Sequence, residues 1–211
     1  MTVAPEISSP VAGEHSAVLA WIFRQRGVLA NLPLLFALFW TRGEVNNSPL
    51  TWSIGLALLL LGMAVRIWAQ SHIHHRLVKT TQFTCTGPYQ IIRNPLYIGN
   101  TLLILAGTFF SKLVWLAPVS LVWCAFVYSL VVRNEEGHLA ALYEEPYREY
   151  LRTVPRWFPK PGTLHNPDFV NEHTGRAVVA ELHCLLVIVP FLIKDMIVNP
   201  AWHGLWGGPR T

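Results

Sequence analysis

Long apolar stretches alternate with short polar ones along most of this chain. Residues 50–69, 96–110 and 113–132 are almost continuously apolar. A helix needs about 20 mostly apolar residues to cross a bilayer, so residues 50–69 predict a spanning helix. Only Ser111 and Lys112 separate the other two runs. That short break predicts a tight helical hairpin, whose first arm is too short to span fully without help.

Two less regular apolar runs complete the pattern. Residues 28–40 are apolar but short, and they can be lengthened backwards through residues 17–23, with the charged residues between them near the membrane surface. Residues 177–198 form a fifth run, which is interrupted by five polar or helix-breaking residues: Glu181, His183, Pro190, Lys194 and Asp195. We therefore predict an all-α, polytopic integral membrane protein with about five transmembrane helices.

The apolar runs divide the chain into three parts. Residues 1–16 are polar and contain Pro and Gly, and they lack the pattern of a cleaved signal peptide, so we expect a flexible N-terminus. Residues 17–161 form the membrane core. Residues 162–211 are expected to provide a linker, an additional transmembrane helix and a short tail.

The composition is typical of a membrane protein and limits the kinds of partner that we expect. Hydrophobic residues make up 52% of the chain and charged residues 13%, against about a quarter charged in an average soluble domain. This excludes a disordered chain, a collagen and a coiled coil, and argues against an ordinary cytosolic enzyme. The net charge is +4, but the basic residues form no single patch, so no nucleic-acid partner is expected. Membrane lipids are the expected surroundings.

The distribution of Lys and Arg predicts the topology. Basic residues concentrate in residues 71–95 and 133–176, which the two-helix hairpin would place on the same side of the membrane. The positive-inside rule assigns that side to the cytoplasm. The short loop at residues 41–49 then faces outward, the N-terminus is cytoplasmic and the C-terminus is external.

The first stretch with candidate chemistry is residues 85–100. Gly87-Pro88 predicts a turn, and Asn94-Pro95 predicts the start of a helix with Pro at its first position. Free N–H groups and the positive dipole end at this helix start, with Arg93 beside them, predict an anion site. The alternative is that Arg93 only reaches lipid phosphate and Tyr97 is an interfacial aromatic residue.

The second stretch follows the hairpin's return arm. Glu135 and Glu136 come directly after a membrane helix, where carboxylates oppose the helix dipole and need a partner. Hairpin geometry brings them near the helix that starts at Pro95. We therefore expect Arg93 to meet Glu135 or Glu136 at the mouth of one pocket. A purely structural ion pair is the alternative.

The third stretch is residues 139–159. Its apolar and aromatic residues recur at helical spacing: Leu139, Leu142, Tyr143, Tyr147, Tyr150 and Leu151. This predicts one or two amphipathic helices at the cytoplasmic membrane surface, the second starting at Pro146. Simple anchoring to the interface is an equally good interpretation.

The remaining ionisable and metal-binding residue types carry no clear motif. Arg66 is near the predicted cytoplasmic end of its helix and can reach the interface. Glu181 and His183 lie within the fifth apolar run, where ionisable groups suggest a functional role, and a pair of Glu181 with Arg176 or His183 is an equally good interpretation. No CxxC or HExxH occurs, so we expect no metal site and no disulfide. The residues that we interpret as interfacial histidines or packing cysteines are His72, His74, His75, Cys85, Cys124 and Cys184.

Several motifs in this order resemble those of the isoprenylcysteine carboxyl methyltransferase and phospholipid methyltransferase superfamily. The resemblance covers roughly residues 50–161. It is carried by Leu61-Gly62 with Arg66 and Trp68, Thr86-Gly87-Pro88-Tyr89, Arg93-x-Pro95-x-Tyr97-x-Gly99, Glu135-Glu136, Tyr147-x-x-Tyr150, and Val154-Pro155-Arg156-x-x-Pro159. One departure is Asn94, because the family pattern usually has His between the Arg and the Pro. Asn can donate and accept hydrogen bonds but cannot carry a proton at neutral pH.

The resemblance implies an integral membrane enzyme that uses S-adenosylmethionine. The cofactor pocket would lie under the cytoplasmic segments and open to the cytosol, and a lipophilic acceptor would enter from the bilayer. The implied cofactor-binding residues are Tyr89, Arg93, Asn94, Pro95, Leu96, Tyr97, Gly99, Glu135 and Glu136. The candidate catalytic residues are Arg93, Glu136, Arg152 and Arg156, of which Arg152 or Arg156 would orient an anionic acceptor head group.

The acceptor itself is not specified by the sequence. The leading expectation is the carboxylate of an isoprenylcysteine-like substrate, which needs no general base. A phospholipid amine, a small thiol or a phenol are alternatives, and an amine needs a base such as Glu136 or His138. Two functions of other classes are further alternatives, namely an NADPH-dependent membrane reductase and a non-catalytic membrane protein that binds lipid.

Overall fold

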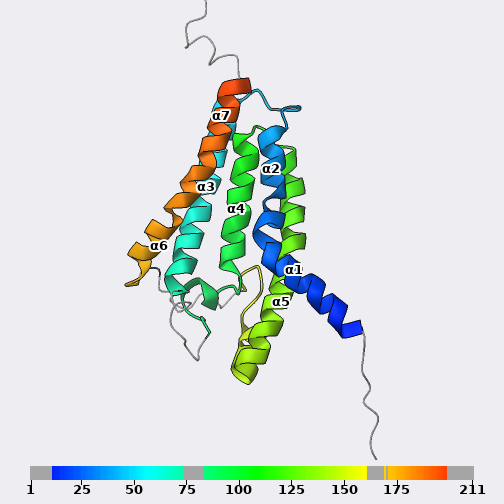
Figure 1. The fold of residues 1–211 in the computed structure, drawn as a ribbon. Helices are drawn as coiled ribbons and strands as arrows, with labels where there is room; N and C mark the ends of the chain where they lie inside the picture. The colour runs from blue at the N-terminus through cyan, green and yellow to red at the C-terminus, as the bar shows by residue number, and fades with distance from the viewer. Residues whose placement is uncertain (1–10, 74–82, 161–168, 170, 199–211) are drawn as a thin grey trace, which may run out of the picture.

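The computed structural model describes residues 11–73, 83–160, 169 and 171–198, and every regular element within them is a helix (Figure 1). The side chains of residues 11–17 and 19 are not described. In chain order the elements are α1 (Val11–Ala30), α2 (Leu32–Phe39), α3 (Ser48–His72), the 3₁₀ helix η2 (Gly87–Gln90), α4 (Pro95–Phe110), α5 (Leu116–Thr153), α6 (Thr174–Glu181), the 3₁₀ helix η3 (Leu182–Val187) and α7 (Ile188–Val198).

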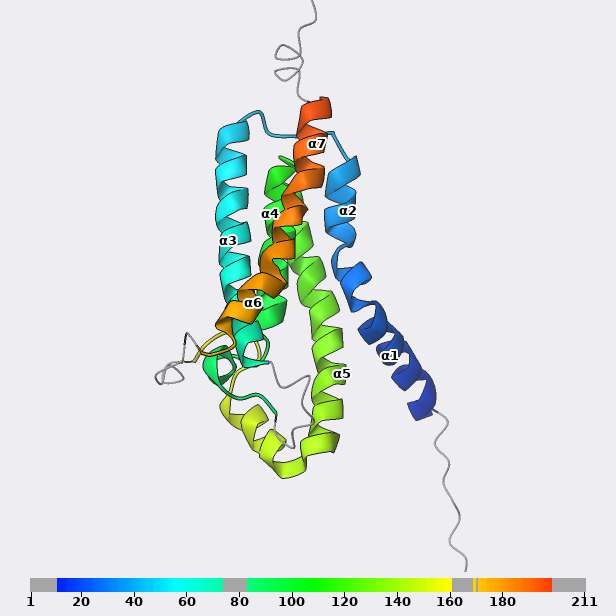
Figure 2. The ribbon, with the colours of Figure 1, turned by 60° about the vertical axis from the view of Figure 1, so that its left-hand side comes forward.

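Four helical segments are long and apolar enough to cross a membrane, namely residues 20–39, 48–72, 116–153 and 174–198. The shorter apolar helix α4 lies among them, as the two views of the bundle show (Figures 1 and 2). This confirms a polytopic, all-α membrane fold. It also agrees with the expectation that the first arm of the hairpin is short for a full span.

The α4–α5 hairpin turns where the sequence predicted it. Helix α4 ends at Phe110 and α5 begins at Leu116. Lys112 has a φ of 59°, a left-handed conformation that reverses the chain direction. Helices α3 and α4 pack closely because glycine is present at the contact. A Cβ atom on Gly62 would lie 3.0 Å from the carbonyl oxygen of Gly99.

Helix α5 continues beyond the bilayer span and then bends. Glu144 has non-helical angles (φ 52°, ψ −129°), and helical geometry resumes around Pro146. Proline fits the first turn of a helix because its missing N–H needs no partner there. The expected second helix therefore starts where predicted. In Figure 2 it turns away from the axis of α5 and runs beneath the end of α3.

The C-terminal segment α6–η3–α7 packs along α3 and α4 rather than standing apart. It contributes to a core shared with residues from α2, α3, α4, the hairpin turn and α5. That core comprises Ala37, Leu59, Met63, Ala106, Phe110, Leu113, Leu116, Cys184 and Phe191. The segment that follows the family motifs is thus an integral part of the membrane bundle.

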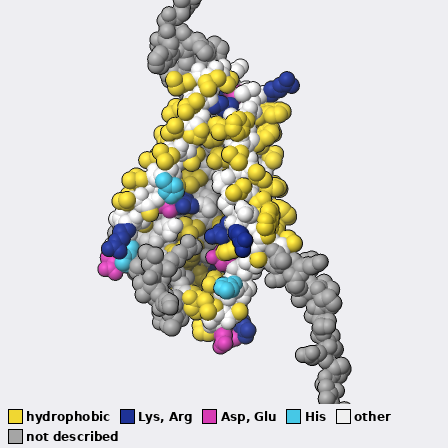
Figure 3. Space-filling view, in the orientation of Figure 1, with side chains coloured by type: hydrophobic (Ala, Val, Ile, Leu, Met, Phe, Trp, Pro, Cys, Tyr) yellow, Lys and Arg dark blue, Asp and Glu magenta, His cyan; other side chains and the backbone are white. Residues whose placement is uncertain are grey.

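The described parts of residues 71–95 and 133–176 lie at the same end of the bundle (Figure 1). The expected juxtaposition of the two basic stretches is therefore present. On the face shown in Figure 3, hydrophobic side chains cover most of the upper part and most charged side chains gather toward that lower end.

A buried charge network ties the opposite end together. Lys112 Nζ lies 2.7 Å from Asp195 Oδ1 and 3.3 Å from Glu44 Oε2. Lys194 Nζ lies 3.2 Å from Glu44 Oε1 and donates to the backbone oxygens of Ala37 and Trp40. These contacts join the loop after α2, the hairpin turn and α7.

Three expectations about individual residues were wrong. Arg66 does not extend to the interface: its guanidinium binds Glu181, with Nε 2.6 Å from Oε2, so Glu181 pairs with neither Arg176 nor His183. Cys85 is exposed rather than packed, while His72 is buried at the end of α3. His74 and His75 lie outside the described residues.

Candidate functional site

The loop before α4 is folded against the end of α3. Thr86 Oγ1 lies 2.9 Å from His72 Nδ1, and Gly87 has a φ of +56°. A Cβ atom on Gly87 would lie 2.4 Å from His72 Nε2, so only glycine fits this close approach. The hydroxyl of Tyr150, from the helix after the bend in α5, donates to the Tyr89 carbonyl at 2.7 Å. These contacts fix the loop that leads to Arg93.

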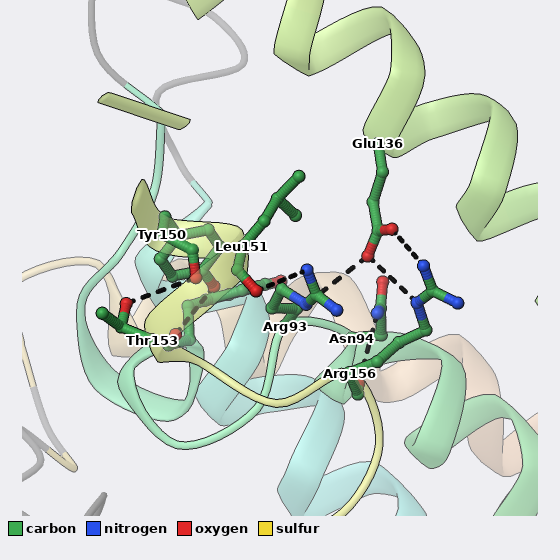
Figure 4. Close-up of polar contacts among 8 residues, drawn as sticks. Arg93, Asn94, Glu136, Tyr150, Leu151, Thr153 and Arg156 are labelled. Atoms are coloured by element: carbon green, nitrogen blue, oxygen red, sulfur yellow. Dashed lines mark hydrogen bonds and ion pairs between the residues drawn. The ribbon is translucent and has the colours of Figure 1, made fainter. Parts of the chain in front are cut away.

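Arg93, Glu136 and Arg156 form a charged group at the start of α4 (Figure 4). Arg156 Nη2 and Nε bind the two oxygens of Glu136 at 2.5 and 3.2 Å. Arg93 Nε lies 3.5 Å from Glu136 Oε1, and its Nη1 donates to the carbonyl of Leu151 at 3.3 Å. The structure thus brings Arg93 and Glu136 together, as the hairpin argument predicted.

Asn94 joins the start of α4 to the segment that follows α5. Its Nδ2 donates to the Arg156 carbonyl at 3.2 Å, and the neighbouring Arg93 N–H donates to Pro155 at 2.9 Å. Asn94 also lines the cavity described below. An amide suffices for this positioning contact because the acceptor is a neutral backbone oxygen.

Glu135 faces the first turn of α4. Its Oε2 accepts a hydrogen bond of 2.9 Å from the Tyr97 hydroxyl. The Tyr97 ring packs against Tyr128 with a centroid distance of 4.7 Å. The two adjacent carboxylates therefore have different partners, since Glu136 binds arginines and Glu135 binds a phenol.

An aromatic cluster closes the other side of the site. The Phe83 ring lies 5.5, 5.1 and 5.3 Å from the rings of Tyr143, Tyr147 and Tyr150. Tyr147 and Tyr150 are 4% and 9% exposed, so this face of the helix packs on the protein instead of on lipid. Burial raises the pKa of both phenols, and the Tyr150 hydroxyl serves as a hydrogen-bond donor to the loop before α4.

These groups enclose a cavity of about 420 Å³ at the polar end of the bundle. Its lining residues come from the ends of α1 and α3, the loop before α4, α4 and both parts of α5. They are Arg26, Arg66, Gln70, Ile73, Phe83, Thr84, Tyr89, Arg93, Asn94, Leu96, Tyr97, Asn100, Glu135, Glu136, Leu139, Tyr143, Tyr147 and Tyr150. The volume is within the range of about 300–1,000 Å³ that is usual for small-molecule sites.

A second cavity of about 320 Å³ lies deeper among the helices. It shares the lining residues Arg26, Arg66, Tyr97 and Asn100 with the first cavity. The rest of its lining is mostly apolar and comprises Gly27, Asn31, Leu34, Leu103, Ile104, Tyr128, His183, Cys184 and Val187. The two cavities therefore meet at one group of polar side chains, close to α4.

Comparison with known proteins identifies the family. The family described as phospholipid methyltransferase matches residues 50–146. The nickel-cobalt-cadmium resistance protein NccN of Alcaligenes xylosoxydans xylosoxydans is 30% identical over 166 residues, which cover 74% of this chain and 74% of that protein. The chain belongs to the phospholipid methyltransferase family. This family is part of the isoprenylcysteine carboxyl methyltransferase-like membrane superfamily.

A second relative of this methyltransferase-family protein is the cobalt-zinc-cadmium resistance protein CzcN of Cupriavidus metallidurans. It is 34% identical over 114 residues, which cover 54% of this chain. The chain spans about half (51%) of the length of that relative. No solved structure matches the chain.

Most of the residues expected to bind cofactor in this family line the first cavity. Those residues are Tyr89, Arg93, Asn94, Leu96, Tyr97, Glu135 and Glu136. Pro95 and Gly99 are buried on α4 beside the cavity, where a Cβ atom on Gly99 would lie 2.5 Å from Arg66 Cγ. Arg156 reaches the site through Glu136.

The structure does not bring Arg152 to either cavity. Its side chain is 64% exposed and pairs with Glu145 and Glu149 at 3.1 and 3.2 Å. Position i+3 relative to Glu149 on a solvent-facing helix explains this local pairing. Arg152 is therefore a surface residue in this family member, and Arg26 and Arg66 are the arginines that line both cavities.

Several lining residues were not identified from the sequence. Arg26, Arg66 and Asn100 lie on three different helices, and no local pattern links them. Phe83 precedes the recognised motif. The position of Tyr147 could have been inferred from the sequence, because Tyr147 and Tyr150 are three residues apart and therefore lie on one face of their helix.

Proposed function

We propose that this chain transfers a methyl group from S-adenosylmethionine to a lipophilic, anionic acceptor. The observation that carries the proposal is the pair of adjoining cavities in a phospholipid methyltransferase fold. One is rich in charged and aromatic side chains and lies at the polar end of the bundle. The other is mostly apolar and lies among the membrane helices. A polar cofactor and a lipophilic acceptor would meet where the cavities join.

The first cavity has the chemistry that S-adenosylmethionine requires. Arg93 Nε is buried and, beyond its ion pair of 3.5 Å with Glu136, makes no hydrogen bond within the described residues, so it can bind a ligand carboxylate as well. Glu135 can accept from a ligand ammonium or ribose hydroxyl in addition to Tyr97. Phe83 and the neighbouring tyrosines provide ring faces for an adenine. When bound, the cofactor supplies an activated methyl group on its sulfonium.

The junction of the cavities favours an anionic acceptor head. The Arg66 charge is compensated by Glu181. Arg26 instead donates to the backbone oxygen of Phe23 at 2.7 Å, and no ion pair joins it to a carboxylate within the described residues. Arg26 is therefore the cation best placed to hold a carboxylate or thiolate, with the acceptor's apolar portion in the second cavity.

The state of Glu136 also favours an acceptor that needs no base. Both of its oxygens are bound by the guanidinium of Arg156, and Arg93 lies beside one of them. Glu136 thus positions the two arginines and is poorly suited to remove a proton. Methyl transfer to an anion requires alignment and exclusion of water, which a membrane-interface cavity provides.

The finer substrate proposal is the carboxylate of an isoprenylcysteine-like molecule, at a site that faces the cytoplasm. A phospholipid amine is the second candidate, because the matching family is described as phospholipid methyltransferase. An amine must lose a proton, and Glu135 is the lining carboxylate that is not bound by arginine. Assays with a prenylated carboxylate and with a phospholipid amine as the acceptor distinguish these two candidates by which methylated product forms.

Ligand-dependent thermal stability of the detergent-purified protein tests the cofactor assignment. A ligand at 100 times its Kd stabilises the native state by about 2.7 kcal/mol, or about 5–11 °C for a chain of this size. We expect this shift with S-adenosylhomocysteine and not with NADPH. Arg93→Ala should abolish the shift, whereas Arg148→Ala, which alters an exposed ion pair of 3.6 Å, should retain it. A full shift in the Arg93 variant, or a shift with NADPH alone, would contradict the proposal.

A further inference from the structure

The C-terminal membrane segment changes its helical geometry in the middle. Helix α6 ends at Glu181, and the 3₁₀ helix η3 runs from Leu182 to Val187 before α7 begins. Residues three apart are eclipsed in 3₁₀ geometry, so Glu181 and Cys184 project on the same side. The donor atoms of Glu181, His183 and Cys184 all lie within 4.8 Å of one another.

The spacing of these atoms suits a tetrahedral metal ion. Cys184 Sγ lies 3.3 Å from Glu181 Oε2 and 3.8 Å from His183 Nε2. Zinc bonds of about 2.3 Å to sulfur and about 2.0 Å to nitrogen or oxygen place tetrahedral neighbours about 3.5 Å apart. Both distances are within a few tenths of an ångström of that value. Two of the three ligand pairs therefore already have the spacing of a tetrahedral site, and the Glu181 and His183 atoms, which lie within 4.8 Å of each other, would move together on binding.

The histidine is already oriented as a ligand. His183 Nδ1 lies 2.5 Å from the Ala180 carbonyl oxygen, and such a contact requires Nδ1 to carry the hydrogen. The lone pair of the neutral ring is then on Nε2, which faces Cys184. A backbone carbonyl bonded to the second ring nitrogen is the usual support of a metal-binding histidine.

The second cavity gives the three ligands an open side. His183 and Cys184 both line it. Three protein ligands with a fourth position facing a cavity are the arrangement of an accessible zinc site, in contrast to the closed four-ligand sites of structural zinc. An ion here would lie beside the proposed acceptor-binding region.

Arg66 already donates to both oxygens of Glu181, so a metal ion would have to share this carboxylate with the guanidinium. A carboxylate offers about four lone-pair positions, so each oxygen can bind a second partner. Metal binding would also deprotonate Cys184: the S–H proton leaves to solvent and the sulfur forms the metal bond. The resulting thiolate charge offsets part of the charge of the ion next to Arg66.

We propose that Glu181, His183 and Cys184 bind a borderline-soft divalent cation of the zinc type. Mixed sulfur, nitrogen and oxygen ligands in a tetrahedral array favour this class over magnesium or calcium. This proposal differs from the sequence-based expectation that Cys184 only packs and that no metal is bound. It does not depend on the proposed methyl transfer.

Cobalt and zinc binding to tag-free protein in detergent tests the proposal. The parent for all measurements is Cys85→Ser, because Cys85 is exposed and would bind metal adventitiously. After dialysis against excess zinc, we expect one ion per chain, and Co²⁺ should give a sulfur-to-cobalt charge-transfer band. Cys184→Ser should remove the band, and His183→Ala should weaken zinc binding at least about tenfold.

Two matched substitutions control for nonspecific effects. Cys124→Ser changes another buried cysteine, and His138→Ala changes another exposed histidine, and both should bind zinc as the parent does. Circular dichroism and elution volume report whether each variant is folded. Absence of stoichiometric zinc in the folded parent, or a cobalt band that survives Cys184→Ser, would overturn the metal site. Because the readout is metal content, a failure of methyl transfer leaves this result unaffected.

Discussion

The buried pair between Arg66 and Glu181 makes a sharp prediction about stability. Glu181→Gln keeps the size of the side chain but removes its charge. Arg66 would then remain buried, with Asn100 as its other side-chain partner. We expect this substitution to be among the most destabilising polar changes in the protein, although both residues lie outside the main charged group around Arg93.

The magnitude follows from the exposure of the pair. The Glu181 side chain is 2% exposed and that of Arg66 is 15% exposed, so solvent cannot compensate the charge that remains. Removing one partner of a buried pair costs about 3–5 kcal/mol. For a chain of this size, 1 kcal/mol corresponds to about 2–4 °C, which gives a fall in Tm of about 6–20 °C.

The assay is thermal unfolding in detergent, with an exposed pair as control. Arg152→Gln removes contacts between side chains that are 61–64% exposed, and solvent screens such pairs, so this change should leave Tm almost unaltered. Replacing both buried partners, as Arg66→Met with Glu181→Leu, should recover much of the loss because no charge remains unpaired. If Glu181→Gln melts as close to wild type as Arg152→Gln does, the reasoning from burial is refuted.

Three further substitutions test other parts of the account. Gly87→Ala should lower Tm by at least about 2–4 °C, because the added methyl would meet His72 at a φ of +56°; thermal unfolding measures it. Asn94→Ala should weaken S-adenosylhomocysteine binding about fivefold, the equivalent of one hydrogen bond, as measured by calorimetry. Asp195→Asn should cost about 1–3 kcal/mol of stability, because it weakens the buried contact to Lys112, while cofactor affinity stays unchanged; paired unfolding and binding measurements decide this.

The sequence was most informative where local patterns determine structure. Apolar run length predicted the membrane helices, and the short break at Ser111-Lys112 predicted the hairpin. The hairpin in turn predicted that Arg93 and Glu136 meet, because it returns the chain to the end where α4 began. Pro146 predicted the start of the last part of α5 for a stereochemical reason, since proline fits a first helical turn.

The sequence was least informative about contacts between distant segments. Arg66 and Glu181 are separated by 115 residues, and each has nearby residues that looked like adequate partners. Which pair forms depends on how α6 packs against α3, and no periodicity in the chain specifies that packing. For Arg152 the sequence predicted a role that the structure does not support. Its neighbours in the sequence belong to the family motifs, but its side chain lies on the exposed face of the helix.

Transfer of a labelled methyl group to lipid is the decisive measurement of the proposed methyl transfer to a lipophilic acceptor. The purified protein is incubated with methyl-labelled S-adenosylmethionine and a total lipid extract that contains prenylated carboxylates, and the organic phase is analysed for labelled product. We expect label in a base-labile methyl ester, and this labelling should depend on Arg93 and be unaffected by Arg148→Ala. Absence of label from every lipid fraction, with folded protein that binds no S-adenosylhomocysteine, would contradict it.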